Sequence, residues 1–155
     1  LCFAGDVCLA FFFNRKVFTA GLVFFLAGHI AYVVAFFITA GITTGTWVSL
    51  VVVPVVSIFI FTRLRSHLGS MRGPVIAYIA IISIMVVGAA SLAARQDYSL
   101  QGRALVMAGA LLFYVSDLFV ARHRFVKKSI VNRYAGLPMY YVAQFMLAFS
   151  VGMIP

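Results

Sequence analysis

Long apolar runs, separated by short polar stretches, make up most of the chain. The runs cover residues 1–13, 17–38, 46–62, 74–94, 103–121 and 137–155. Several come close to the roughly 20 residues that a helix needs to cross the hydrocarbon core of a bilayer. The runs show no strand-like alternation, and only helices and closed barrels satisfy their backbone hydrogen bonds in lipid. The pattern predicts an all-α, polytopic membrane helix bundle of about six helices in a single transmembrane domain, residues 1–155.

The first run is shorter than a membrane span, and the chain begins with Leu1 in the middle of that run. No basic stretch precedes it, although a secretory signal peptide has one. We therefore expect a fragment that lacks upstream helices, and not a mature chain left by signal cleavage.

Composition agrees with a membrane protein. Of 155 residues, 65% are hydrophobic and 10% are charged, whereas soluble domains average about 45–50% apolar and about 25% charged residues. The net charge of +9 would suit a nucleic-acid partner if the basic residues formed one patch. They fall instead in the connections between apolar runs, so membrane topology explains them better and no nucleic acid is expected.

The basic residues also predict the orientation. Ten of the twelve follow the first, third and fifth runs: Arg15, Lys16, Arg63, Arg65, Arg72, Arg122, Arg124, Lys127, Lys128 and Arg133. The other two are Arg95 and Arg103. Since cytoplasmic loops are enriched in Lys and Arg, we expect the loops after residues 13, 62 and 121 to be cytoplasmic, in a bacterial cytoplasmic membrane.

Two of the three acidic residues, Asp6 and Asp117, lie inside apolar runs. A charged side chain at the centre of a membrane helix costs about 2.5–3.5 kcal/mol and usually marks a functional site. At a rise of about 1.5 Å per residue, Asp117 lies about 8 Å and Asp6 about 12 Å from the cytoplasmic end, with His29 about 18 Å deep. The two carboxyl groups are therefore expected at similar depth on one side.

Residues three and four positions apart share a helix face. Asp117 shares one with small and apolar residues, which predicts that it points into the bundle. Three such inward faces are expected: Gly109, Ala110, Phe113, Ser116 and Asp117; Phe25, Gly28, His29, Tyr32 and Phe36; and Tyr140, Tyr141, Gln144, Ala148 and Gly152.

Two carboxyl groups held close together suit general acid and general base catalysis, because their environments separate their protonation states. A lipid is the expected substrate, since the site lies within reach of acyl chains, and Arg122 and Arg124 are positioned to hold a phosphate headgroup. A second interpretation is a proton-coupled transporter or channel with Asp6, His29 and Asp117 as a relay. A third is a structural role in bridging helices. No metal site or cofactor is predicted, because His29 is the single histidine inside a run and zinc sites need three or four ligands.

Several of these residues belong to short motifs that occur in a known protein family. Gly5-Asp6, the stretch from Gly21 through Gly28-His29 to Tyr32, Gly109-Ala110 running into Ser116-Asp117, Arg124-Phe125, and Tyr141 with Gln144 occur in this order. In these motifs and their spacing the chain resembles the YhhN-like membrane proteins, the lysoplasmalogenases, from Gly5 to about Gln144.

The resemblance implies an eight-helix membrane fold whose upstream helices, with a Lys-Pro element, are missing from this chain. It implies hydrolysis of the vinyl ether bond of a lysoplasmalogen, a lysophospholipid, with Asp6 and Asp117 as the catalytic pair. The roles of acid and base stay open, as does the oligomeric state. Supporting residues in the motifs would be Gly5, His29, Tyr32, Ser116, Tyr141 and Gln144.

Overall fold

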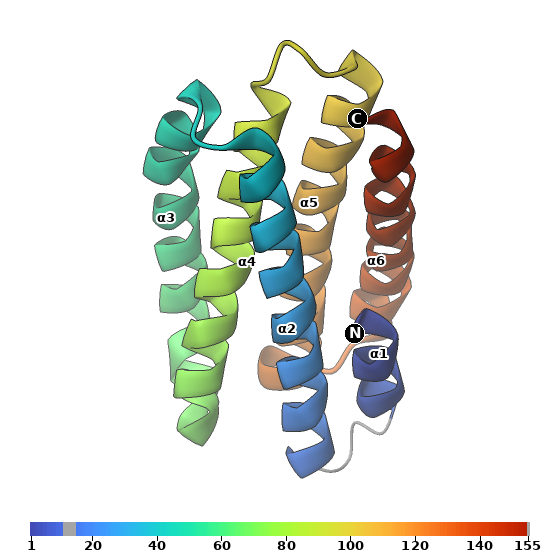
Figure 1. Ribbon diagram of the computed structural model, residues 1–155. Coiled ribbons are helices and arrows are strands. Elements are labelled where there is room, and N and C mark those ends of the chain that lie inside the picture. The colour runs from blue at the N-terminus through green and yellow to red at the C-terminus, as the bar shows by residue number, and fades with distance from the viewer. Residues whose placement is uncertain (11–14, 155) are drawn as a thin grey trace.

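The computed structural model describes residues 1–10 and 15–154, and these residues form six α-helices and no strand (Figure 1). The helices are α1 (Cys2–Ala10), α2 (Arg15–Ala40), α3 (Thr44–Leu64), α4 (Arg72–Ala93), α5 (Leu100–Ala121) and α6 (Ile130–Ser150). A π-helical turn, η3 (Arg122–Val126), follows α5, and short 3₁₀ turns join α3 to α4 and end the chain. The predicted all-α bundle is confirmed.

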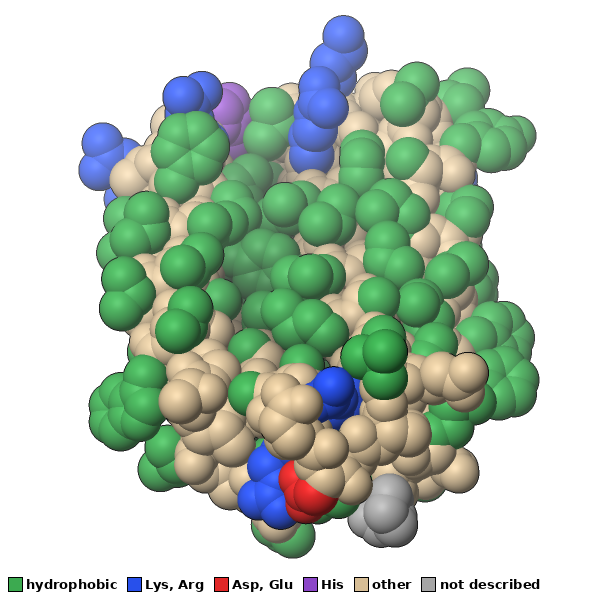
Figure 2. Space-filling model, turned by 90° about the horizontal axis from the view of Figure 1, so that it is seen from above, with side chains coloured by type: hydrophobic (Ala, Val, Ile, Leu, Met, Phe, Trp, Pro, Cys, Tyr) green, Lys and Arg blue, Asp and Glu red, His purple; other side chains and the backbone are tan. Residues whose placement is uncertain are grey.

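Five of these helices are long and apolar enough to cross a membrane. The segments are Lys16–Ala40, Thr44–His67, Gly69–Ala93, Leu100–Val126 and Ile130–Met153. Large hydrophobic side chains are exposed along their outer faces. Figure 2, which views the molecule from above relative to Figure 1, shows hydrophobic side chains over most of the visible surface and only a few Lys and Arg side chains. The chain is an integral, multi-pass membrane protein.

Helix α4 lies at the centre of the bundle, packed against α2, α3 and α5, while α6 packs on α5 and α1 on α2. In Figure 1, α3 forms one edge of the bundle, and α1 and α6 lie at the other. Glycine allows the approach of α1 to α2, because a Cβ atom at Gly5 would lie only 2.6 Å from two ring carbons of Phe25. This contact holds the short helix α1, and with it Asp6, against the bundle.

The hydrophobic core fills the half of the bundle near the α2–α3 and α4–α5 connections. Met85, Phe113 and Ala110 have no exposed surface, and Leu92 and Val106 are almost fully buried. Close packing of this kind leaves little free volume. The opposite half, near the α3–α4 and α5–α6 connections, is more open and contains the cavity described below.

Several predicted boundaries were wrong. The largest error is in the last helix, which begins at Ile130 and not at residue 137. Gly136 packs its backbone against Phe119 of α5, and the helix continues through Pro138. A proline inside a membrane helix is tolerated where neighbouring helices compensate for the lost hydrogen bond.

Smaller shifts affect the other helices. Helix α5 begins at Leu100, because the Ser99 side chain caps it by accepting a hydrogen bond from the Gly102 amide. Helix α3 begins at Thr44, where Thr43 and Thr46 form a capping box. Of the predicted run 1–13, residues 11–13 lie outside the described part of the chain, as does the last residue of the run 137–155.

The predicted inward faces of α2 and α5 are confirmed, since Phe25, His29, Phe113 and Ser116 are buried. The face predicted for α6 is partly wrong. The buried residues of α6 are Asn132, Gly136, Tyr140, Ala143, Leu147 and Ser150. Tyr141 is 47% exposed, and Ala148 and Gly152 are exposed as well. Adjacent residues project about 100° apart on a helix, so Tyr140 and Tyr141 do not share one face.

Candidate functional site

A cavity of about 300 Å³ is lined by residues of all six α-helices and contains both intramembrane carboxyl groups. Its lining runs from Ile82 and Tyr114, midway along their helices, to His123 and Phe125 in η3. The predicted site required α1 and α5 to be neighbours. Helix α1 packs on α2, while α5 packs on α4 and α6, so the shared cavity is what brings Asp6 and Asp117 into one site.

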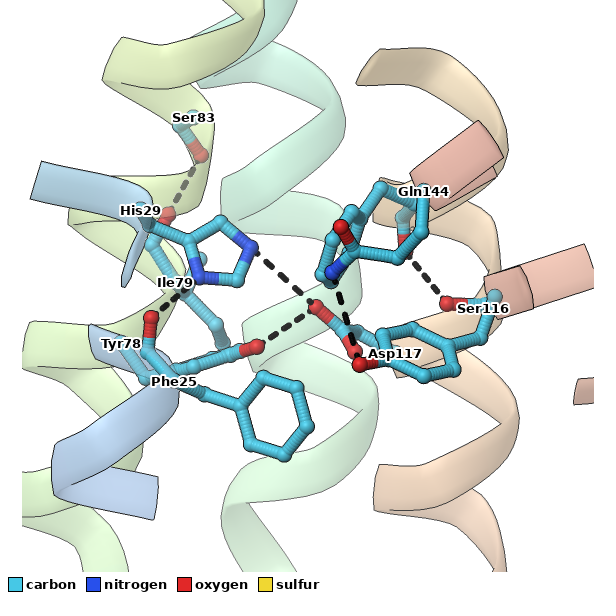
Figure 3. A network of polar contacts seen from close by, with 10 residues as sticks. Phe25, His29, Tyr78, Ile79, Ser83, Ser116, Asp117 and Gln144 are labelled. Atoms are coloured by element: carbon cyan, nitrogen blue, oxygen red, sulfur yellow. Dashed lines mark hydrogen bonds and ion pairs between the residues drawn. The ribbon is translucent and has the colours of Figure 1, made fainter. Parts of the chain in front are cut away.

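Asp117 projects from α5 into the cavity with 16% of its side chain exposed. The Tyr78 hydroxyl of α4 donates a 2.6 Å hydrogen bond to Asp117 Oδ2. His29 Nε2 of α2 lies 3.8 Å from the same oxygen. Figure 3 shows both side chains directed at this carboxylate from one side. Three helices therefore converge on one carboxyl oxygen.

Tyr78 was missed by the sequence analysis. It is the single tyrosine in the run 74–94, and a hydroxyl in so apolar a helix needs a partner. That signal could have marked it as inward-facing. It could not have identified Asp117 as the partner, because the pairing depends on how α4 packs against α5.

Asp6 is held by a chain of hydrogen bonds from two other helices. The Tyr140 hydroxyl of α6 donates to Asp6 Oδ2 at 2.9 Å, and the Gln144 amide donates to the Tyr140 hydroxyl at 3.4 Å. The Tyr32 hydroxyl of α2 donates to Gln144 Oε1 at 3.1 Å. In this series of hydrogen bonds each donor points toward Asp6, so the Asp6 carboxylate is the final acceptor.

His29 is 1% exposed and lies behind the cavity wall, outside the set of described residues that line it. Its Nδ1 lies 2.6 Å from the Phe25 carbonyl oxygen. A carbonyl only accepts hydrogen bonds, so Nδ1 carries a proton. The ring packs edge-on against Phe113 and Tyr78, at centroid distances of 4.6 and 5.3 Å. Within the described residues, Nε2 has no hydrogen-bond partner.

The other predicted residues have different surroundings. Ser116 is buried and lines the cavity, but its hydroxyl donates to the Phe113 carbonyl at 2.7 Å. Gly5 provides the close contact of α1 with α2. Tyr141 lines the edge of the cavity, with its ring 5.0 Å from that of Tyr140.

The cationic groups at the loop end of the cavity differ from those predicted. Arg122 is exposed and is absent from the described lining, whereas Arg133 and His123 line the cavity. The guanidinium of Arg124 lies over the Phe18 ring at 4.6 Å, and this ring is part of the cavity wall. Arg133 was assigned to a loop by the sequence analysis. The early start of α6 places it in the first turn of that helix.

Asp97, the third acidic residue, does not line the cavity. Asp97 lies in the α4–α5 connection, where Arg95 donates to both of its carboxyl oxygens at 2.8 and 2.6 Å. These hydrogen bonds from the guanidinium hold the pKa of Asp97 below its usual range.

Across residues 1–10 and 15–154, no three or more His, Cys, Asp or Glu side chains form a group that could hold a metal ion.

Comparison with known proteins identifies the family of the chain. The model of the YhhN family matches residues 1–151. No curated protein and no solved structure matches the chain significantly. The family match covers nearly all of the sequence, including both intramembrane aspartates and the residues around them, and the chain belongs to the YhhN family.

Proposed function

We propose that this protein is a membrane-embedded hydrolase that cleaves the vinyl ether bond of a lysoplasmalogen and uses Asp6 and Asp117 as its acid–base pair. One observation carries the proposal: two of the three acidic residues in the chain line one cavity. Each of the two carboxyl groups accepts a tyrosine hydroxyl. Keeping two carboxyl groups at membrane depth is costly, which favours a chemical role over helix bridging.

The reaction requires one acid and one base. The acid protonates the vinyl carbon distal to the ether oxygen, so that the C=C π electrons form the new C–H bond and an oxocarbenium ion remains. Water adds to this ion, loses a proton to the base and gives a hemiacetal. The hemiacetal hydroxyl then gives up its proton while the C–O bond to glycerol breaks and the glycerol oxygen takes up a proton, which releases a fatty aldehyde and a glycerophospho-alcohol. Paired carboxyl groups assist an oxocarbenium-like transition state in glycoside hydrolysis in the same way.

The cavity suits an amphiphilic substrate. Its volume of about 300 Å³ is at the lower end of the range for small-molecule sites, about 300–1,000 Å³. Most of the lining is apolar, for example Leu22, Ile79 and Ile82, and would accept a hydrocarbon chain. Arg133 and His123 lie at the loop end, where a phosphate headgroup would meet them. Guanidinium groups bind phosphate through charge-assisted hydrogen bonds.

A transporter would need a polar path to both faces of the membrane. The described lining ends at Ile82 and Tyr114, and beyond these residues the packed core of Met85, Ala110 and Phe113 fills the bundle. This arrangement favours a hydrolase over the relay of Asp6, His29 and Asp117.

A third interpretation is that the two aspartates only bridge helices. In that case, replacing either of them by Asn would lower the stability of the protein without any loss of activity.

The test is aldehyde release from a defined lysoplasmalogen by the purified protein in lipid nanodiscs. Asp6→Asn and Asp117→Asn each remove one carboxylate and keep a side chain of nearly the same shape. Asp97→Asn is the matched control, because Asp97 is exposed and outside the cavity. We expect kcat to fall at least about 100-fold in the first two variants, as for the loss of an acid or base, and to be unchanged in the control.

Folding of the variants is checked by monodispersity and by the thermal unfolding midpoint. Activity retained by a folded Asp117→Asn protein would refute the catalytic assignment. Proton flux that either substitution abolishes, without any hydrolysis, would support the transporter instead.

A further inference from the structure

Two carboxyl groups in one cavity do not by themselves show which is the acid. Asp6 accepts a hydrogen bond from Tyr140 at the end of a chain of neutral donors. Asp117 accepts one from Tyr78 and has in addition an imidazole nitrogen 3.8 Å from Oδ2. The difference that bears on their protonation is that a nitrogen base lies behind Asp117.

The protonation of His29 is constrained by its contacts. Nδ1 is committed as a donor to the Phe25 carbonyl. Nε2 thus either bears a lone pair, in the neutral ring, or a second proton, in the imidazolium. Leaving a buried nitrogen without a partner costs about 1–3 kcal/mol, and Nε2 has no hydrogen-bond partner among the described residues. The nearby Asp117 oxygen is the group that can relieve this cost.

The separation of 3.8 Å exceeds a normal N–H···O distance by about 0.8 Å. A small rotation of the Asp117 carboxyl group toward α2 would close the gap, and this carboxyl group borders the free volume of the cavity. The Phe113 and Tyr78 rings confine the imidazole, so the carboxyl group moves and the ring stays. One proton fits between the two side chains, on the carboxyl oxygen or on Nε2.

We infer that His29 is a positioning residue that shares one proton with Asp117, which makes Asp117 the acid of the reaction and Asp6 the group that accepts the proton from water. This inference rests on the proposed function. When Asp117 gives its proton to the vinyl carbon, the pair is left as neutral His29 and an Asp117 carboxylate beside the oxocarbenium ion. The proton that water releases to Asp6 passes to the leaving glycerol oxygen as the hemiacetal C–O bond breaks. The proton of the hemiacetal hydroxyl passes to the Asp117 carboxylate and restores the proton that the pair shares.

The other titratable groups of this cluster are known. They are Tyr78 from α4, Tyr140 from α6 and the Cys2 thiol, which lies against Gly28 on α2. Neutral phenol and thiol groups donate hydrogen bonds but are poor proton acceptors near pH 7. Among the described residues of this cluster, the remaining bases are His29 and the Asp6 carboxylate, and of these it is His29 that has a nitrogen 3.8 Å from Asp117 Oδ2.

The first test compares His29→Gln with His67→Gln in the aldehyde assay across pH 5 to 9. Glutamine keeps hydrogen-bonding groups near Asp117 but cannot store a proton. His67 is the control, because it is exposed in the α3–α4 connection, where its ring hydrogen-bonds to the adjacent Ser66. We expect His29→Gln to lower kcat about 10- to 100-fold, to leave KM within twofold, and to change the shape of the pH–rate profile. His67→Gln should have the same kcat, KM and pH–rate profile as the wild type.

The second test needs no substrate. Protein labelled with ¹⁵N-histidine in lipid bilayers is studied by solid-state NMR, with the His29 signals assigned by their loss in His29→Gln. We expect Nδ1 to be protonated, and Nε2 to be partly protonated near pH 7 in the wild type but bare from pH 5 to 9 in Asp117→Asn.

The outcomes separate the inference from the function on which it rests. Hydrolysis with an unchanged pH profile in His29→Gln overturns the inference and leaves the function. Identical Nε2 protonation in wild type and Asp117→Asn also overturns it. A shared proton in the NMR spectra without any aldehyde release supports the pair and refutes the proposed hydrolase.

Discussion

The contact between Gly5 and Phe25 gives a sharp test of how α1 positions Asp6. A Cβ atom at Gly5 would lie 2.6 Å from Cδ2 and Cε2 of the Phe25 ring, whereas carbon atoms in contact are about 3.5–4.0 Å apart. In Gly5→Ala, α1 and the ring must therefore separate by about 1 Å. Overpacking of this size costs about 1–3 kcal/mol.

The short helix is the part expected to move. Helix α1 has nine residues, and helices of that length have little stability of their own. Asp6 follows Gly5 directly, so a displacement of about 1 Å lengthens the 2.9 Å bond from Tyr140 beyond the usual O–H···O range of about 2.5–3.0 Å. A catalytic group misplaced by about 1 Å can lose about 100-fold in rate.

We therefore expect Gly5→Ala to lower kcat for aldehyde release by about 10- to 100-fold, while the five long helices stay folded. Circular dichroism and the elution volume check the fold. Thiol labelling of Cys2 and Cys8, both free and on α1, should become faster. Gly73→Ala is the matched control, because a Cβ atom there meets nothing within 4 Å; it should keep full activity.

A compensating change makes the prediction refutable. Phe25→Leu shortens the side chain that collides with the new methyl group, so the double variant should recover part of the activity that Gly5→Ala loses. If the kcat of Gly5→Ala equals that of the wild type, the packing argument is wrong. It is also wrong if the fold loss of kcat in the double variant is at least the product of the fold losses in the two single variants.

Two further predictions concern the cavity. Tyr78→Phe removes the hydroxyl that donates to the α5 carboxylate but keeps the ring. Since one hydrogen bond to a charged group is worth about 1.5–3 kcal/mol, we expect the thermal unfolding midpoint to fall by a few degrees and kcat of the folded protein to fall at least about tenfold. An unchanged kcat would exclude Tyr78 from the reaction. Arg133→Gln should raise KM for a phospholipid substrate about two- to fivefold, as for an exposed ion pair, and more than Arg122→Gln does, because Arg133 lines the cavity and Arg122 does not. Equal effects on KM would contradict the assignment of the headgroup end.

The site residues differ in how far the sequence could predict them. Asp6 and Asp117 stand out as carboxyl groups in apolar runs, because burying charge is costly wherever it occurs. Tyr140 was recognised only as part of a polar stripe, and Tyr78 was missed. Their importance comes from hydrogen bonds across 134 and 39 positions of the chain. No local pattern contains that information.

The chain by itself determined the elements and their environment. Apolar runs of membrane length must be helical in lipid, because every backbone polar group has to be satisfied within the segment. The charged loops and the inward faces of α2 and α5 follow from the same local rules of periodicity and solvation.

Tertiary structure decided the rest. The packing of α4 at the centre, the start of α6 at Ile130 and the choice of Tyr140 over Tyr141 as the inward residue depend on which helices meet. So does the placement of the His29 ring behind Asp117. Side-chain packing between distant segments fixes these features, and it forms only once the whole bundle has assembled.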